Sequence, residues 1–157
     1  MSGIKKGDAL EAKENKMRAV DKWYDAMKGK NSADWDELLD ENVEFHSPVV
    51  FTPQKGKKIT KMYLLAASEV FGSDHFNPPS QGETKTQTGF RYIKEVIGER
   101  SALLEFESEI EGTYINGIDL LTWNEAGKLI EVKVMVRPLQ AVNVLHQQMK
   151  AMLESMT

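Results

Sequence analysis

The chain of 157 residues contains no cysteine and only three histidines, His46, His75 and His146. The absence of cysteine excludes disulfide bonds, thiolate catalysis and cysteine-ligated zinc. The histidines lie far apart, without the His-x-x-x-His or Glu-x-x-His spacing that is typical of zinc and di-iron sites. We therefore expect neither a metal ion nor another cofactor.

Long apolar runs and an excess of positive charge are also missing. No segment approaches about 18 consecutive apolar residues, and residues 1–6 lack the apolar stretch of a signal peptide, so we expect a cytoplasmic protein with no membrane partner. The net charge of −4 offers no general attraction to phosphate backbones, which argues against nucleic-acid binding. Residues 53–60 contain a Gly-Lys pair but not the first glycine of a P-loop, and no Gly-x-Ser-x-Gly elbow of a serine hydrolase is present.

What is present is typical of one globular domain. Hydrophobic residues make up 41% of the chain and charged residues 28%, which are ordinary fractions. A chain of this length buries about two-thirds of the surface that it exposes when unfolded, enough for a substantial core. We expect a single domain over residues 1–157, with residues 1–8 as a flexible N-terminal tail.

The spacing of apolar residues predicts the order of the elements. Recurrence every three to four positions indicates helices around residues 17–27, 35–39, 58–71 and 139–153. Alternation of apolar and polar residues indicates strands at 43–50, 90–97, 102–111, 113–123 and 129–136. In the last strand this alternation places Ile130, Val132, Val134 and Val136 on one face. The polar segment 73–89 is long for a loop in a compact domain, which is typical of a lid or a mobile surface loop.

This order of elements favours an α+β fold. Helices come first, a meander of four strands follows, and one helix closes the chain, whereas a parallel sheet would alternate strands with helices. The helices must bury their apolar stripes against one face of an antiparallel sheet. The opposite face is then free to be wetter or to pair with another copy of the protein.

Asp119 is the residue in the predicted sheet that most needs an explanation. It lies among Ile118, Leu120 and Leu121, just before the turn at residues 124–127. A carboxyl group in such a strand is exposed, paired, or kept neutral by a raised pKa. A neutral carboxyl group can donate a hydrogen bond at neutral pH, which an enzyme can use. The alternative is an ordinary strand aspartate that points into solvent.

Several other polar side chains also lie on elements that look buried. If they converge on one cavity, they form an apolar pocket with a few polar groups, the usual small-ligand site. The alternative for each is a satisfied buried hydrogen bond, and for Arg137 an ion pair with a glutamate. The residues are Tyr24, His46, Ser47, Tyr63, Ser108, Asp119 and Arg137.

The chain resembles the nuclear-transport-factor-2-like superfamily, and within it the SnoaL-like branch of polyketide cyclases and ketosteroid isomerases. The resemblance covers roughly residues 16–153. It is carried by the order of elements, by the segments 38–48 and 117–128, and by the Lys-Val-Met-Val-Arg-Pro-Leu segment 133–139. It implies a cone-shaped, curved antiparallel or mixed sheet that is closed by N-terminal helices and a C-terminal helix around a pocket. It also implies a homodimer formed through the outer sheet face.

The resemblance assigns roles to some residues and shows that other catalytic residues of the family are replaced in this chain. Asp119, in an Ile-Asp pair, falls on the protonated aspartic acid of the isomerases, and their companion tyrosine falls on Trp23 or Tyr24. The isomerase base falls on Ser47, which cannot act as that base unaided. His46 is adjacent, but strand alternation turns it to the other face unless Pro48 distorts the strand. The epoxide hydrolase machinery is missing, because its arginine and two aspartates fall on Phe106, Ser108 and Val134.

Two functional hypotheses follow. The first is a protein that binds a small apolar molecule in a pocket. If it is an enzyme, it isomerises or cyclises a carbonyl or polyketide-like compound, with Asp119 as the acid or base and Tyr24 or Tyr63 as the hydrogen-bond donor. The second is a non-catalytic dimeric ligand-binding or interaction module whose pocket is filled by large residues such as Phe45, Phe106 and Trp123. The catalytic candidates are Asp119, Tyr24 and His46, and the ligand-binding candidates are Trp23, Ser47, Tyr63, Phe106, Ser108, Trp123 and Val134.

Overall fold

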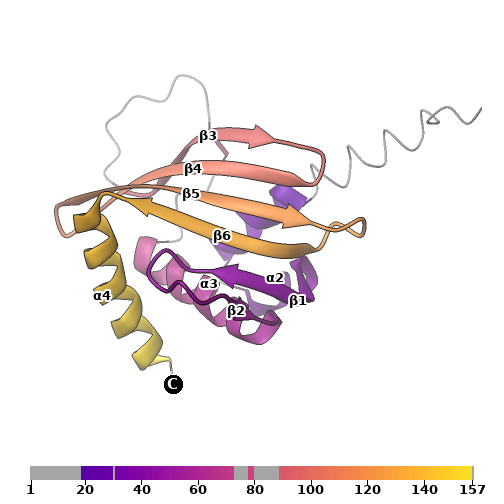
Figure 1. The fold of residues 1–157 in the computed structure, drawn as a ribbon, viewed down its shortest axis with the longest axis horizontal. Helices are drawn as coiled ribbons and strands as arrows, with labels where there is room; N and C mark the ends of the chain where they lie inside the picture. The colour runs from indigo at the N-terminus through magenta and orange to yellow at the C-terminus, as the bar shows by residue number, and fades with distance from the viewer. Residues whose placement is uncertain (1–18, 30, 73–77, 80–88, 157) are drawn as a thin grey trace, which may run out of the picture.

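The computed structural model describes residues 19–29, 31–72, 78–79 and 89–156. The predicted tail at residues 1–8 and nearly all of the predicted loop 73–89 lie outside these ranges. Residues 19–29 are helical, and the further elements follow along the chain as drawn in Figure 1. They are α2 (Ser32–Leu38), β1 (Leu39–His46), β2 (Gln54–Lys55), α3 (Lys57–Phe71), β3 (Arg91–Ile97), β4 (Ser101–Ile110), β5 (Thr113–Trp123), β6 (Leu129–Arg137) and α4 (Leu139–Ser155).

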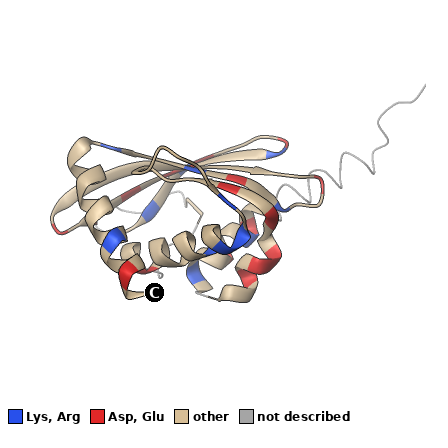
Figure 2. Cartoon of the chain, turned by 60° about the horizontal axis from the view of Figure 1, so that its bottom comes forward, with Lys and Arg blue, Asp and Glu red and all other residues tan. Residues whose placement is uncertain are grey.

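The fold is α+β, as the order of elements predicts. The six strands form one curved sheet in the order β2-β1-β6-β5-β4-β3, in which β3 to β6 are the predicted antiparallel meander. Strand β1 adds to β6 in parallel, and β2 pairs antiparallel with β1, so the sheet is mixed. The helices lie on one face of this sheet, while charged residues are spread over both layers (Figure 2). No helix in the described ranges is both long and apolar enough to cross a lipid bilayer.

Alternation along β4 and β5 decides which side chains face the helices. In β4, Leu104, Phe106 and Ser108 are buried, and the glutamates between them face the opposite side, as predicted. In β5, the residues from Ile115 to Trp123 at every second position are buried, and Asp119 is one of them. Because side chains alternate between the two faces of a strand, Asp119 shares the inner face with the apolar core.

Strands β1 and β6 differ from the sequence prediction. β1 spans Leu39–His46 and not the predicted residues 43–50, and it begins early because Leu39 pairs with Leu129 of β6. In β6 the predicted inward position of Ile130 is wrong. A register shift pairs Trp123 with Leu129 and Thr122 with Glu131, so Ile130 has no partner in β5 and is exposed, whereas Leu129 is buried. An extra residue of this kind is a β-bulge, which reverses the facing of the residues that precede it.

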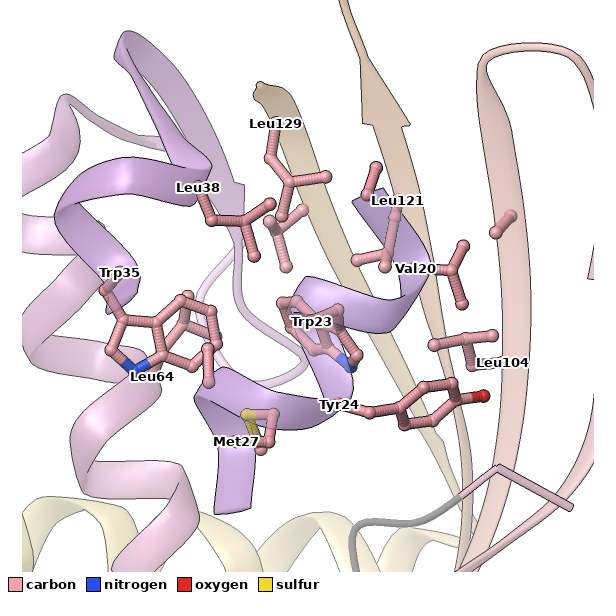
Figure 3. Packing of buried hydrophobic residues seen from close by; sticks show 14 of the residues in the cluster. Val20, Trp23, Tyr24, Met27, Trp35, Leu38, Leu64, Leu104, Leu121 and Leu129 are labelled. Atoms are coloured by element: carbon pink, nitrogen blue, oxygen red, sulfur yellow. The ribbon is translucent and has the colours of Figure 1, made fainter. Parts of the chain in front are cut away.

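The core between helices and sheet is rich in aromatic side chains. Trp23, Trp35 and Trp123 are all buried, and the rings of Trp23 and Trp35 meet edge to face at 5.4 Å. Figure 3 shows Trp23 and Trp35 on the helices opposite Leu121 and Leu129 on the strands. Fully burying one large apolar side chain contributes about 2–3 kcal/mol, so these residues hold the helical layer on the sheet.

Helix α3 carries two neighbouring rows of side chains that differ in burial. Thr60, Leu64 and Ser68, spaced by four residues, are buried and form one row, and Ala66 is buried as well. The neighbouring row of Tyr63, Ala67 and Phe71 is only partly buried. Since residues four apart lie on one helix face, the second row is free to line a cavity.

Candidate functional site

A cavity of about 270 Å³ lies between α3, α4 and the end of β1. Residues of α3, α4 and β6 form its walls, and the segment that follows β1 borders it. The lining residues are Phe45, Ser47, Pro48, Val49, Val50, Tyr63, Ala67, Phe71, Val134, Leu145, His146, Met149, Lys150, Leu153 and Glu154.

The walls of this cavity are mostly apolar. The rings of Phe45 and Tyr63 stack at 5.2 Å and an angle of 27°. From α4, Leu145, Met149 and Leu153 follow one another at four-residue spacing, the arrangement that puts them on one helix face. Displacing water from such a surface favours an apolar ligand.

A few polar groups border the cavity. The Ser47 hydroxyl accepts a hydrogen bond from the Val49 amide at 3.2 Å, and its own proton remains available for donation. For the Tyr63 hydroxyl the structure gives no hydrogen-bond partner among the described residues. On α4, His146, Lys150 and Glu154 are exposed where they border the cavity. The cavity can therefore offer a ligand a small number of hydrogen bonds.

Asp119 occupies the inner face of β5 and is only 6% exposed. The Tyr92 hydroxyl donates to Asp119 Oδ2 at 2.8 Å and accepts a hydrogen bond from the indole Nε1 of Trp23 at 3.0 Å. These three residues come from β5, β3 and the first helix, so the chain of hydrogen bonds ties the helical layer to the sheet.

Burial controls the acidity of this network. Removal of the Asp119 carboxyl from water raises its pKa from 3.8 to about 7, against the opposing effect of the Tyr92 hydrogen bond. Burial and the nearby Asp119 carboxylate raise the pKa of Tyr92 well above its usual range. At neutral pH Asp119 is therefore protonated in a large fraction of molecules, which is the property that acid catalysis by a carboxyl group requires.

Asp119 and the cavity are neighbours, but Asp119 does not line the cavity. Val134 pairs with Asp119 across β5 and β6, and Val134 forms part of the cavity wall. Phe71, also in the wall, packs against the rings of Phe106 and Phe90, with ring centroids 5.7 Å and 5.1 Å away. Phe90 in turn contacts Tyr92, the hydrogen-bond partner of Asp119, at 4.9 Å between ring centroids. Packed aromatic rings thus connect the cavity to the buried carboxyl group.

The structure brings Ser47, Tyr63 and Val134 together at the cavity, in line with their predicted role in ligand binding. Trp23 and Phe106 lie instead in the aromatic cluster around Tyr92. The assignment of these residues as ligand-binding stays a prediction.

Tyr24, Ser108 and Trp123 lie away from the cavity lining. The Tyr24 hydroxyl donates to Glu95 at 3.0 Å, and burial is the main cause that raises its pKa. Ser108 is buried beside Ile115, and Trp123 is buried where β5 pairs with Leu129.

His46 is on the face opposite Asp119. It follows the buried Phe45 in β1, and its imidazole lies beside carboxylates of the outer face. The predicted effect of strand alternation therefore holds, and His46 and Asp119 do not meet in one site.

Arg137 on the outer face contacts an amide, and the described residues give it no direct ion pair. Its Nε donates to the Asn116 side-chain oxygen at 2.8 Å. The Asn116 amide nitrogen donates to Glu105 at 3.0 Å and to the carbonyl of Phe106 at 2.9 Å.

Sequence reasoning missed Tyr92 and the cavity row of α4. Tyr92 lies in a correctly predicted strand, but its alignment with Asp119 depends on a register shift between Tyr92 and Lys94. The spacing of Leu145, Met149 and Leu153 was visible as a helical stripe, yet periodicity alone does not distinguish a core surface from a cavity wall.

Comparisons with known proteins identify the fold. Neither a model of a protein family nor a curated protein sequence matches the chain. Among solved structures, a steroid delta-isomerase from Pseudomonas aeruginosa is 23% identical with a TM-score of 0.75, and the alignment covers 90% of this chain and 93% of that one. The chain has the nuclear-transport-factor-2-like fold. A nuclear-transport-factor-2-like protein of unknown function from Mesorhizobium loti superimposes with a TM-score of 0.61 at 15% identity, covering 80% of this chain and 93% of that one.

An enzyme of this fold is also among the similar structures. SalBIII, an epoxide hydrolase/cyclase-like enzyme with a role in pyran ring formation in the polyether salinomycin, is 13% identical with a TM-score of 0.58. The alignment covers 81% of this chain and 94% of SalBIII. At these identities the likeness concerns the fold, because one fold supports many unrelated activities.

Proposed function

We propose that this protein binds a small, mostly apolar molecule in the cavity between α3 and α4. The observation that supports the proposal is the apolar lining of the cavity, formed by rows from two helices and by Phe45 and Val134. Its volume of about 270 Å³ is close to the lower end of the range for ligand sites, which favours a small ligand. Ser47 and Tyr63 supply hydroxyl groups that can bind one carbonyl or hydroxyl oxygen of that ligand.

Filling the cavity with a larger side chain tests this proposal. Ala67 lines the cavity, whereas Ala126 is exposed in the turn between β5 and β6, so Ala67→Trp and Ala126→Trp form a matched pair. Binding is measured by fluorescence titration with an apolar dye, and by native mass spectrometry for molecules retained during purification. We expect Ala67→Trp to lose binding and Ala126→Trp to keep it. Equal binding by two folded variants contradicts the proposal.

We infer a second candidate activity, proton transfer at a carbonyl compound as in isomerisation or cyclisation. It is supported by the raised pKa of the buried Asp119 and by its hydrogen bond from Tyr92. Asp119 does not line the cavity, so a ligand there reaches this carboxyl group only if intervening side chains move. Turnover of a β,γ-unsaturated ketone, followed through the ultraviolet absorbance of the conjugated product, tests the activity. Loss of turnover in Asp119→Asn supports it, and equal turnover in this variant and the unmodified protein removes Asp119 from the reaction.

The outer face of the sheet supports the proposal of a homodimer. Val96, Tyr114 and Met135 are exposed there at 54%, 52% and 51%. Large apolar side chains exposed on one face of a sheet favour association with a second copy. Sedimentation equilibrium at micromolar concentration measures the mass in solution, and a monomer contradicts this proposal.

The alternative of a non-catalytic interaction module with a filled pocket is supported by the close packing around Asp119. It differs from the ligand-binding proposal in its expected results. A stable dimer that retains no small molecule and does not bind the apolar dye favours the module.

A further inference from the structure

The outer face carries a second group of side chains that the proposed cavity does not use. Glu44 and His46 lie two residues apart on β1, which turns both to the same face. The parallel pairing of β1 with β6 sets Glu44 opposite Glu131 and His46 opposite Lys133. Three potential ligand atoms, one imidazole nitrogen and two carboxylate oxygens, are therefore supplied from two adjacent strands.

The distances within this group are longer than hydrogen bonds. His46 Nε2 lies 3.7 Å from Glu44 Oε2 and 3.8 Å from Glu131 Oε2, and the three ligand atoms all lie within 4.8 Å of one another. His46 Nε2 is shielded from solvent and has no hydrogen-bond partner among the described residues, although the imidazole as a whole is 22% exposed. A buried polar atom without a partner calls for an ion or a water that satisfies it.

We propose that Glu44, His46 and Glu131 bind a first-row divalent cation of the Zn²⁺ type. Zinc accepts nitrogen and carboxylate oxygen at about 2.0–2.2 Å, so the ligand atoms of a tetrahedral site are about 3.3–3.5 Å apart. The observed separations from Nε2 exceed this by a few tenths of an ångström, which small rotations of the two glutamate side chains remove. The imidazole ligand favours zinc or another transition metal over calcium and magnesium, which prefer all-oxygen sites.

The nearby lysines leave the inner oxygens of the glutamates free for the cation. Lys55 Nζ is 3.8 Å from Glu44 Oε1, and Lys133 Nζ is 3.8 Å from Glu131 Oε1. In both pairs the lysine faces Oε1, whereas Oε2 faces His46. Outer partners of this kind orient ligating carboxylates. They also offset the negative charge that two close glutamates bring together.

The proposed site supplies three protein ligands. Three protein ligands around zinc leave one tetrahedral position for water or a small molecule. A hollow of about 450 Å³ begins at His46 and is also lined by Ser47, Lys133 and Met135. The spacing of the histidines did not reveal the site, because Glu131 is distant in sequence and meets His46 only through the parallel pairing of β1 and β6.

Zinc titration of the full chain tests the proposal. The protein is stripped with a chelator, dialysed, and titrated with Zn²⁺ alone by isothermal titration calorimetry. We expect one zinc ion per chain, with affinity reduced at least about tenfold in His46→Ala and in Glu131→Gln. The controls are His146→Ala on α4 and Glu109→Gln, an exposed carboxylate of β4, and both should bind zinc as the unmodified chain does.

Two results overturn the proposal. Absence of zinc binding at millimolar concentration shows that Glu44, His46 and Glu131 are neighbours on the outer face that hold no cation. Unchanged affinity in both His46→Ala and Glu131→Gln shows that zinc binds elsewhere in the chain. Glu131→Gln nearly preserves the size of the side chain, so it remains informative if His46→Ala fails to fold.

Discussion

Replacing Asp119 by asparagine should make the stability of this protein less dependent on pH. The carboxyl group is buried in the folded protein with a pKa of about 7, whereas 3.8 applies to the unfolded chain. A carboxyl group that holds its proton more tightly in the folded state contributes most to stability below its unfolded pKa. That contribution is lost as the pH rises from 3.8 to about 7. Asparagine does not titrate, so it has no such loss.

The size of the effect follows from the two pKa values. One pKa unit corresponds to about 1.4 kcal/mol, so the rise from 3.8 to about 7 is worth about 4 kcal/mol as an upper limit. At about pH 5 some of this stabilisation is already lost. Between about pH 5 and about pH 8.5 the protein loses the rest, roughly 2–3 kcal/mol, because the loss ends near the folded-state pKa. The free energy of unfolding of Asp119→Asn should therefore increase relative to the unmodified protein by about this amount over that pH range.

Urea unfolding at several pH values measures this difference. Tryptophan fluorescence follows the transition because Trp23, Trp35 and Trp123 are all buried, and protein concentration is held constant in case the chain dimerises. Any pH-independent effect of the amide cancels when the difference is compared between pH values. Asp21→Asn, at an exposed position of the first helix, is the control and should show no comparable trend. The reasoning is refuted if the difference in free energy of unfolding between Asp119→Asn and the unmodified protein stays constant within about 0.5 kcal/mol over this pH range.

Two further predictions concern the packing around this carboxyl group. Tyr92→Phe removes the hydrogen bond that lowers the pKa of Asp119. The fall in the free energy of unfolding that Asp119 causes should therefore extend to a higher pH, as measured by the same urea series. Gly117→Ala should destabilise the protein by about 2–3 kcal/mol, because the added Cβ would lie 2.4 Å from Phe106 Cζ and 2.7 Å from the Met135 carbonyl oxygen. Thermal unfolding checks this value, and a Phe106→Leu change in the same chain should recover part of the loss. An unchanged Tm in Gly117→Ala would show that the two strands separate easily.

The fold and the facing of the β4 side chains could be predicted because they depend on local patterns. Alternation in β4 predicts which side chains face the helices, and the structure confirms it for Phe106 and Ser108, whereas the sequence left open whether Asp119 faces the core or the solvent. Ile130 was placed wrongly because a β-bulge interrupts the alternation, and a single extra residue leaves no signal in the period of a short strand.

The relation of the cavity to Asp119 could not be predicted from the same patterns. The resemblance places a pocket around Asp119, whereas the structure shows the cavity beyond its cross-strand neighbour Val134. The position of the cavity depends on how the rows of α3 and α4 meet. Side chains such as Phe71 of α3, which packs against Phe106 of β4, border the cavity, and the sequence pattern does not specify which rotamer each ring adopts.

The sequence by itself determined the α+β class and the meander of four strands, because these follow from the periods of helix and strand over a few residues. Only the tertiary structure decided the burial and the partners of the Asp119 carboxyl group and the location of the cavity. It also decided the meeting of Glu44, His46 and Glu131, whose side chains join only because β1 pairs in parallel with β6. Contacts between distant segments depend on strand order and register, which local periodicity does not specify.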